Sequence, residues 1–265
     1  MTKIHKPQHC GDNSDHWVDV EESPRRVHVV FGGETIADSR HVLLVREAMR
    51  VPVYYFPKED VRADLMVATG NITHCPYKGD ASYWTVKVGN KAADNAAWSY
   101  LEPLVECTAI QGAITFEWGK MDAWYEEEEE IFVHPRDPYK RVDVMQSSRH
   151  VRVVMAGETV AETHRPRLLF ETGLPTRYYM PKEDVRAELI EPSSTTSRCP
   201  YKGLASYWSI KVGGKVFKDF VWSYPNPIPE SPKIKDLLCF FNERVDATYV
   251  DSELLAAPKT HWSLG

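Results

Sequence analysis

The feature that most constrains this chain is a long internal repeat. Three pairs of residues share a spacing of 124 positions: Cys75 and Cys199, Gly33 and Gly157, and Trp98 and Trp222. The spacing holds without a gap from Val27 to Asp122, and nearly half of the positions between Ser23 and Pro103 are identical to their counterparts. A repeat of this length exceeds the roughly 20 to 50 residues of a solenoid unit. It indicates the tandem duplication of a whole domain of ordinary size.

The duplication sets the expected domain organisation. We expect residues 23–125 to form repeat 1 and residues 147–255 to form repeat 2. The remaining segments show no duplicate partner: an N-terminal extension at 1–22, a linker at 126–146 and a C-terminal tail at 256–265. The linker is rich in proline and begins with five consecutive glutamates. Because like charges repel one another, a solvated edge or linker is the simpler interpretation of this run, and a cation-binding acidic patch is the alternative.

The residue pattern of both copies predicts a mainly β fold. β-branched and polar residues alternate around a glycine turn at 26–39 and again at 150–163, which is typical of a hairpin. The dipeptides Gly89-Asn90 and Gly213-Gly214 separate two further runs, and they tolerate the positive φ angles of a two-residue turn. The stretch 113–124 predicts a last hairpin that closes repeat 1, and its counterpart does the same in repeat 2.

The composition excludes several classes of protein. A formal net charge of −6 argues against a general nucleic-acid binder, because neutralising phosphates requires a basic surface. No apolar run approaches the roughly 20 residues that span a bilayer, and the N-terminus lacks the apolar core of a signal peptide. We therefore expect a cytoplasmic protein that has neither nucleic acid nor a membrane as a partner.

The cysteines indicate neither a disulfide framework nor a zinc site. There are five of them, an odd number without compact spacing. No Cys-x-x-Cys pair is present, so a zinc site would have to gather scattered thiolates. The sequence also lacks a glycine-rich phosphate loop and a Gly-x-Ser-x-Gly nucleophile elbow. We therefore expect no metal and no cofactor.

The pentapeptide CPYKG occurs once in each copy. A neighbouring lysine stabilises a thiolate, so Cys75 and Cys199 are candidate nucleophiles. Free cysteine is, however, among the most buried residue types, and residues three apart in an extended strand point to opposite faces. We therefore expect packed, neutral thiols, with proline and glycine orienting Lys78 and Lys202. A fixed ammonium group can hold an anionic ligand, and an exposed structural lysine is the alternative.

A glutamate recurs at Glu47 and Glu171 although the residues around it differ, LLVREAMRVP against LLFETGLPTR. A carboxylate that stays while its neighbours diverge indicates a specific hydrogen-bonding role. We expect Glu47 to pair with Lys78 across strands, and Glu171 to pair with Lys202. A buried pair of this kind is either a catalytic dyad or a costly structural ion pair.

The stretches YYFPKEDVRA and YYMPKEDVRA differ at a single position. Each contains Lys-Glu-Asp after a proline, which predicts a short helical turn. Asp60 and Asp184 are candidates for acid–base or ligand contacts, and alternatively for hydrogen bonds that close this turn. Tyr55 and Tyr179 either offer a hydroxyl group to a ligand or only pack their rings.

Several separated motifs follow one another along the chain, and most of them recur in the other copy in the same order. They are SPRRVHVVFGGETIADS, LLFETGLPTRYYMPKEDVRAEL, the two CPYKG stretches with the ASYW that follows, and HPRDPYKRVDV. Together they resemble the family named domain of unknown function 427 over about residues 23–255. The resemblance implies a small, mostly antiparallel fold of the β-tent kind in each copy. That shape is related to domains that often hold zinc, but the paired cysteines of the zinc-bearing relatives are missing here. The family is also labelled a nucleotidyltransferase, for which this chain shows no phosphate cradle and no set of metal-binding carboxylates.

Two hypotheses for function remain. In the first, each copy is a small-molecule site, in an enzyme of unassigned reaction or in a binding protein. Its catalytic residues would be Glu47, Lys78, Glu171 and Lys202. Its ligand-binding residues would be Tyr55, Asp60, Cys75, Tyr83, Tyr179, Asp184, Cys199 and Tyr207. In the second, the chain is a non-catalytic binding or scaffold module whose repeated residues stabilise turns and cores.

The two hypotheses differ in what they require of these side chains. A ligand site needs a few polar groups that converge in a concave pocket. We expect a small-molecule ligand, anionic if the lysines bind it, and a chain that is either a monomer with an internal pseudo-two-fold axis or a homodimer.

Overall fold

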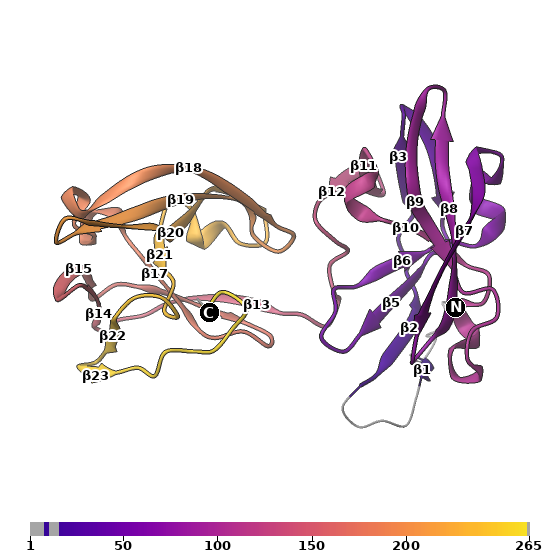
Figure 1. Cartoon of the computed structure of the whole chain (residues 1–265). Coiled ribbons are helices and arrows are strands. Elements are labelled where there is room, and N and C mark those ends of the chain that lie inside the picture. Colours follow the sequence, from indigo (N-terminus) through magenta and orange to yellow (C-terminus); the bar gives the residue numbers. More distant parts are fainter. Residues whose placement is uncertain (1–7, 11–15, 264–265) are drawn as a thin grey trace. The chain divides into compact units, whose positions relative to one another are not determined.

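The computed structural model describes residues 8–10 and 16–263 (Figure 1). The chain divides into two compact units, Met1–Asp137 and Pro138–Gly265, and each is described here by itself. Both are mainly β, as the sequence predicts, and all pairing between the described strands is antiparallel. No helix in the described residues is long and apolar enough to cross a membrane.

The two units match each other strand for strand. The strands of repeat 1 are β2 (Val18–Glu22), β3 (Val27–Phe31), β4 (Glu34–Ser39), β5 (Leu43–Glu47), β6 (Val53–Tyr55), β7 (Met66–Cys75), β8 (Gly79–Val88), β9 (Lys91–Ser99), β10 (Ile114–Phe116), β11 (Ala123–Glu126) and β12 (Glu129–Ile131). Their counterparts in repeat 2 are β13 (Val142–Gln146), β14 (Val151–Met155), β15 (Glu158–Thr163), β16 (Arg167–Glu171), β17 (Arg177–Met180), β18 (Ile190–Cys199), β19 (Gly203–Val212), β20 (Lys215–Pro227), β21 (Leu238–Phe240), β22 (Ala247–Val250) and β23 (Glu253–Leu254). Repeat 1 has one strand more, β1 (Gln8–Cys10).

Short 3-10 helices connect the strands. They are η1 (Lys58–Asp60), η2 (Ala63–Leu65), η3 (Val105–Ile110) and η4 (Trp118–Lys120) in repeat 1, and η5 (Lys182–Asp184), η6 (Ala187–Leu189) and η7 (Pro232–Ile234) in repeat 2. The predicted helical turns at Lys-Glu-Asp are therefore present as η1 and η5.

Each repeat has the same arrangement of strands, which form two sheets in repeat 2 and three in repeat 1. In repeat 2 a seven-stranded sheet has the order β13-β16-β17-β21-β20-β19-β18, and a small sheet has the order β15-β14-β22-β23. In repeat 1 the corresponding strands form the sheets β1-β2-β5-β6, β10-β9-β8-β7 and β12-β11-β3-β4. A single bridge between Phe56 and Ile114 joins the first two of these sheets where β17 pairs with β21 in repeat 2.

Two apolar clusters stabilise each repeat. The larger one lies against the small sheet, where alternate residues of β3 and β14 are buried, including Val27 and Val151 with no exposed surface. The smaller one contains Tyr55 and Tyr100 in repeat 1, and Tyr179 and Tyr224 in repeat 2. Burying one large apolar side chain contributes about 1.5–3 kcal/mol. The candidate site residues border the smaller cluster.

The duplicated unit begins earlier than the sequence prediction placed it. β2 starts at Val18 and β13 at Val142. β2 pairs with β5 and β13 pairs with the equivalent strand β16, and both contain the tripeptide Val-Asp-Val. The expected extension 1–22 and linker 126–146 therefore each contain part of a repeat. The similarity is hidden because the flanking residues differ, WVDVEES against RVDVMQS.

The glutamate run lies in the edge hairpin of the small sheet, where Glu127, Glu128, Glu129 and Glu130 are exposed, as a solvated edge would be. It forms the turn between β11 and β12, which pair with each other. Glu126 is buried, accepts a hydrogen bond of 2.8 Å from the hydroxyl group of Tyr54 and forms an ion pair of 2.7 Å with Arg25. Arg26 forms an ion pair with Glu128. Arg25 and Arg26, which precede β3, therefore offset part of the repulsion among these glutamates.

The hairpins predicted at 26–39 and 150–163 are present as β3–β4 and β14–β15. The hairpin predicted for 113–124 is not. β10 pairs with β9, whereas β11 pairs with β3 of the small sheet. The turn at η4 carries the chain from one sheet to the other, so the two runs separate instead of pairing.

Candidate functional site

The CPYKG segment is a tight turn between two long strands. The backbone N–H of Lys78 donates to the carbonyl group of Cys75, and that of Lys202 donates to Cys199, each over 3.3 Å. The glycine that follows has a positive φ, 98° at Gly79 and 105° at Gly203. A Cβ atom at Gly203 would approach a backbone oxygen at 3.2 Å, so glycine is required. The turn fixes the direction of the lysine that precedes this glycine.

Each lysine forms the ion pair that the sequence predicts. The Nζ of Lys78 donates to Oε2 of Glu47, and the Nζ of Lys202 donates to Oε2 of Glu171. The lysine side chains are 9% and 10% exposed, and those of the glutamates 15% and 6%. The glutamates end β5 and β16, so strand and turn bring together residues that are 31 positions apart. Both repeats contain a buried ion pair.

Tyrosines and tryptophans surround the pair. Tyr55 and Tyr179 are buried, and each hydroxyl group accepts a hydrogen bond from an indole N–H, that of Trp98 at 3.3 Å and that of Trp222 at 3.1 Å. Burial raises the pKa of both tyrosines well above the usual value. They remain neutral at physiological pH.

The hydroxyl groups of Tyr83 and Tyr207 lie at the exposed side of the cluster. The first is 2.9 Å from Thr73 Oγ1 and the second is 2.7 Å from Ser197 Oγ. Tyr83 lies opposite Trp98 on the neighbouring strand, and their ring centroids are 6.3 Å apart. These two phenols are the accessible polar groups of the site.

One further tyrosine in each copy, Tyr100 or Tyr224, belongs to the site although it is not among the residues that the sequence predicts for it. Burial raises the pKa of Tyr100 well above its usual value. The Nζ of Lys78 is 6.0 Å from the centroid of the Tyr100 ring. The tripeptide Trp-Ser-Tyr recurs in both copies and was a usable signal, because residues two apart on a strand share a face.

We call these residues the lysine–tyrosine cluster. In repeat 1 it consists of Glu47, Tyr55, Cys75, Lys78, Tyr83, Trp98 and Tyr100. In repeat 2 it consists of Glu171, Tyr179, Cys199, Lys202, Tyr207, Trp222 and Tyr224. Contacts and electrostatic interactions link the members in both copies. The candidate residues therefore converge, apart from the two aspartates.

Cys75 and Cys199 are half-buried at the border of the apolar cores. In each repeat a buried residue donates a hydrogen bond to the backbone of the CPYKG turn. This residue lies on η3 in repeat 1 and next to η7 in repeat 2. Cys107 Sγ donates to the carbonyl oxygen of Tyr77 at 3.3 Å, and its counterpart Ser231 Oγ donates to that of Tyr201 at 3.2 Å. A cysteine in one copy and a serine in the other make the same hydrogen bond, so both copies maintain the geometry of this turn.

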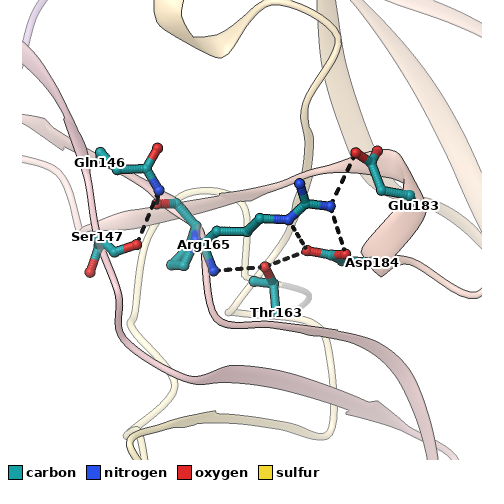
Figure 2. Close-up of polar contacts among 7 residues, drawn as sticks. Gln146, Ser147, Thr163, Arg165, Glu183 and Asp184 are labelled. Carbon is teal, nitrogen blue, oxygen red and sulfur yellow. Dashed lines mark hydrogen bonds and ion pairs between the residues drawn. The ribbon is translucent and has the colours of Figure 1, made fainter.

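Asp60 and Asp184 lie at a different corner of the fold. Asp60 accepts a hydrogen bond of 2.6 Å from Ser39, and Asp184 accepts one of 2.6 Å from Thr163. Figure 2 shows Asp184 between Thr163 and the guanidinium group of Arg165. The hydrogen bond from Arg165 is the main cause that lowers the pKa of Asp184. These aspartates fasten the 3-10 turn to the end of β4 or β15, the structural alternative for this motif.

The surroundings of the cluster differ between the repeats. In repeat 1, His16 stacks on Tyr77 with ring centroids 3.5 Å apart, and its Nε2 is 3.0 Å from Oε1 of Glu47. At the corresponding position of repeat 2, the Nζ of Lys140 is 5.9 Å from the centroid of the Tyr201 ring. A second cationic or ionisable group therefore accompanies each turn, in a different chemical form.

Repeat 2 has an additional cover from the C-terminal segment. Arg177 and Glu243 form a buried bidentate ion pair of 2.6 and 2.7 Å, and Thr260 donates to the same carboxylate at 2.8 Å. The guanidinium carbon of Arg177 is 5.5 Å from the ring centroid of Trp222 and 5.2 Å from that of Trp262. Trp222 is consequently buried, whereas Trp98 in repeat 1 is half-buried.

The described residues contain no group of three or more histidine, cysteine, aspartate and glutamate side chains that could hold a metal ion. The lysine–tyrosine cluster presents an ammonium group, a carboxylate, phenol hydroxyl groups and a thiol. Such groups can bind acceptor-rich molecules and exchange protons.

Fold and site together define a duplicated antiparallel β protein whose copies carry the same buried lysine–glutamate pair beside tyrosine hydroxyl groups. The family model described as Domain of unknown function (DUF427) matches residues 19–127 and 143–251. The chain therefore belongs to this family and contains two tandem copies of its domain. The two matches start 124 positions apart, in agreement with the strand correspondence. No curated protein matches the chain.

Proposed function

We propose that each repeat binds a small molecule at its lysine–tyrosine cluster. The observation that carries the proposal is the buried Lys78–Glu47 pair and its exact counterpart, Lys202–Glu171. Removing two charges from water costs several kcal/mol per ion, and a buried pair is weak support for stability. Both copies nevertheless keep the pair although the residues around the glutamate have diverged. A binding role accounts for this retention better than stability does.

The hydrogen-bonding capacity of the cluster favours an acceptor-rich, anionic ligand. An ammonium group has three N–H donors, and among the described residues the hydrogen bond of Lys78 goes to Glu47. Tyr83 and Tyr100 add hydroxyl groups, and burial keeps Tyr100 neutral and therefore able to donate. A carboxylate or a similar anion matches this set of donors.

The alternative is a non-catalytic module in which the cluster is purely structural. It is favoured by one observation, that the charge of each lysine is already neutralised by its glutamate. Under this alternative the pair only orients the CPYKG turn, and no small molecule is retained.

The experiment is a screen of the purified chain against metabolite pools, with retained compounds identified by mass spectrometry. We expect retention by the wild-type chain and its loss after Lys78→Met and Lys202→Met are combined with Glu47→Met and Glu171→Met. Removing both partners avoids an unpaired buried charge, so the variant keeps its fold.

Lys91→Met is the matched control, because Lys91 pairs with Asp122 on the surface, where its side chain is 51% exposed. It should retain the same compounds as the wild type. Failure of the wild-type chain to retain any compound, or equal retention by the fourfold variant, would favour the structural alternative.

A further inference from the structure

β13 is the outermost strand of the large sheet of repeat 2, and one of its edges faces away from that sheet. Two hydrogen bonds show which backbone groups of this segment point towards β16 and which point to the open edge. Thr172 N–H donates to the carbonyl oxygen of Arg141, and Ser147 N–H donates to that of Pro166, each at 3.0 Å. Residues 141 and 147 therefore bond towards β16. Because backbone direction alternates along an antiparallel strand, the N–H and C=O groups of Val142 and Val144 point to the open edge.

The corresponding edge of repeat 1 carries a strand. β1 pairs there with β2, in a register that places Gln8 opposite Val20 and Cys10 opposite Val18. The same alternation applies, because Ala48 N–H donates to the carbonyl oxygen of Trp17 at 3.0 Å, on the β5 side. The accepting edge has the sequence Val-Asp-Val at 18–20, which is identical to 142–144 in repeat 2.

Repeat 2 has a groove at the place that β1 takes in repeat 1. The groove has a volume of about 300 Å³ and is lined by residues 142–145 of β13 and residues 230–233 at η7. The segment 230–233 corresponds to part of η3 in repeat 1, and η3 contacts β1. The groove of repeat 2 and the seat of β1 are therefore equivalent positions of the duplicated fold.

A lysine closes this edge. Lys233 Nζ donates a hydrogen bond of 3.1 Å to the carbonyl oxygen of Val144, one of the groups that point to the open edge. In repeat 1 the equivalent carbonyl group belongs to Val20, which lies opposite Gln8, and position 109 is alanine in place of lysine. Lysine at an edge strand is a known way to prevent unwanted strand pairing. Here its ammonium group occupies the acceptor that an added strand would use.

We propose that the β13 edge binds an extended segment of another polypeptide by strand addition, with the incoming backbone displacing Lys233 from Val144. The segment would pair with β13 as β1 pairs with β2, because residues 8–10 lie against the identical Val-Asp-Val edge in repeat 1. This goes beyond the proposed small-molecule function, since it concerns a protein partner and residues outside the lysine–tyrosine cluster.

A second copy of this chain is the less favourable source of such a segment. Its β1 already pairs with its own β2, so transfer to β13 would open one strand edge for each edge that it closes. A partner polypeptide brings backbone groups that have no such prior pairing, and the added hydrogen bonds are a net gain.

The test uses the full-length chain and a fluorescent synthetic peptide of residues 4–14 with Cys10→Ser, because residues 8–10 already pair with an identical edge. We expect fluorescence anisotropy to show binding. Lys233→Met removes the competing donor and should tighten binding roughly five- to tenfold. Val144→Pro removes the outward N–H, is tolerated at an edge, and should weaken binding at least tenfold. Val144→Thr keeps the N–H and should bind like the wild type.

Other results would overturn the proposal. Binding that survives Val144→Pro would place the peptide elsewhere, and absence of binding to both the wild-type chain and Lys233→Met would exclude the edge. A wild-type dimer in sedimentation that Val144→Pro dissociates would assign the edge to a second copy. Should Val144→Pro not fold, amide hydrogen exchange in the wild-type chain decides, since the peptide must slow exchange at Val144.

Discussion

Removing one partner of the buried pair should destabilise the protein far more than removing both. In Lys202→Met the carboxylate of Glu171, whose side chain is 6% exposed, loses its ammonium partner. Breaking a buried ion pair in this way costs about 3–5 kcal/mol. Glu171→Met leaves the lysine unpaired and should cost a similar amount. The double variant replaces the pair with two apolar side chains and should lie within about 1 kcal/mol of the wild type.

The assay is urea unfolding followed by tryptophan fluorescence and circular dichroism, with the two units fitted as separate transitions. The four proteins form a double-mutant cycle in repeat 2, and we expect an interaction free energy of at least about 2 kcal/mol. Additivity of the two single variants within about 0.5 kcal/mol would refute the reasoning, because the ammonium and carboxylate groups would then not depend on each other.

Repeat 1 provides an internal comparison for this experiment. The side chain of Glu47 is 15% exposed, and the imidazole of His16 also contacts its carboxylate. Lys78→Met therefore leaves a better solvated and partly hydrogen-bonded carboxylate. It should destabilise the protein less than Lys202→Met does. An equal or larger loss in repeat 1 would contradict the role given to burial and to His16.

A spectrophotometric titration should show Tyr55 and Tyr179 ionising well above the usual pH, because burial raises their pKa. The unfolded chain then loses these protons first, so unfolding free energy should fall as pH rises above about 10, and a flat profile would contradict this. Iodoacetamide at neutral pH should modify half-buried Cys75 before Cys239, whose pKa burial raises to about 12, and equal rates would contradict the burial difference. Trp262→Ala should lower the stability of repeat 2 by about 1–3 kcal/mol and expose residues 256–263 to proteases, whereas unchanged cleavage would mean that this tail is not docked.

The sequence was sufficient where both copies repeat the same residue against different neighbours. The pairing of Glu47 with Lys78 was predictable because the glutamate recurs inside diverged flanks. The bend at CPYKG was predictable in part, since proline and glycine restrict the chain, but only the structure shows the hydrogen bond from Lys78 N–H to the carbonyl group of Cys75 that closes the turn. Glycine dipeptides likewise located the long hairpins, such as β8–β9.

Other features depend on contacts between distant segments, which local patterns do not contain. Whether β11 pairs with β10 or with β3 is decided by which sheet has an unpaired edge and an apolar face to bury. The aspartate of the Lys-Glu-Asp turn has two chemically reasonable roles, and the position of the hydroxyl group of Ser39 selects the structural one for Asp60. The cover of Trp262 over repeat 2 has no duplicate partner, so comparison of the copies could not reveal it.

The differences between the copies have a consequence for the proposed site. Both keep the ion pair, but Trp98 is half-buried in repeat 1, whereas Trp222 is buried in contact with Arg177 and near the tail. In repeat 2 the ion pair of Arg177 and Glu243, whose side chains are 7% and 0% exposed, already covers the Trp222 side of the cluster. A ligand at repeat 2 must therefore bind beside this cover. Rearranging that pair would cost several kcal/mol, so the two sites should differ in affinity, with repeat 1 the tighter. Calorimetric titration with a retained compound should then resolve two classes of site, and replacing Glu47 and Lys78 together by methionine should remove the tighter one. Loss of the weaker class instead would assign the open site to repeat 2 and contradict the role given to the C-terminal cover.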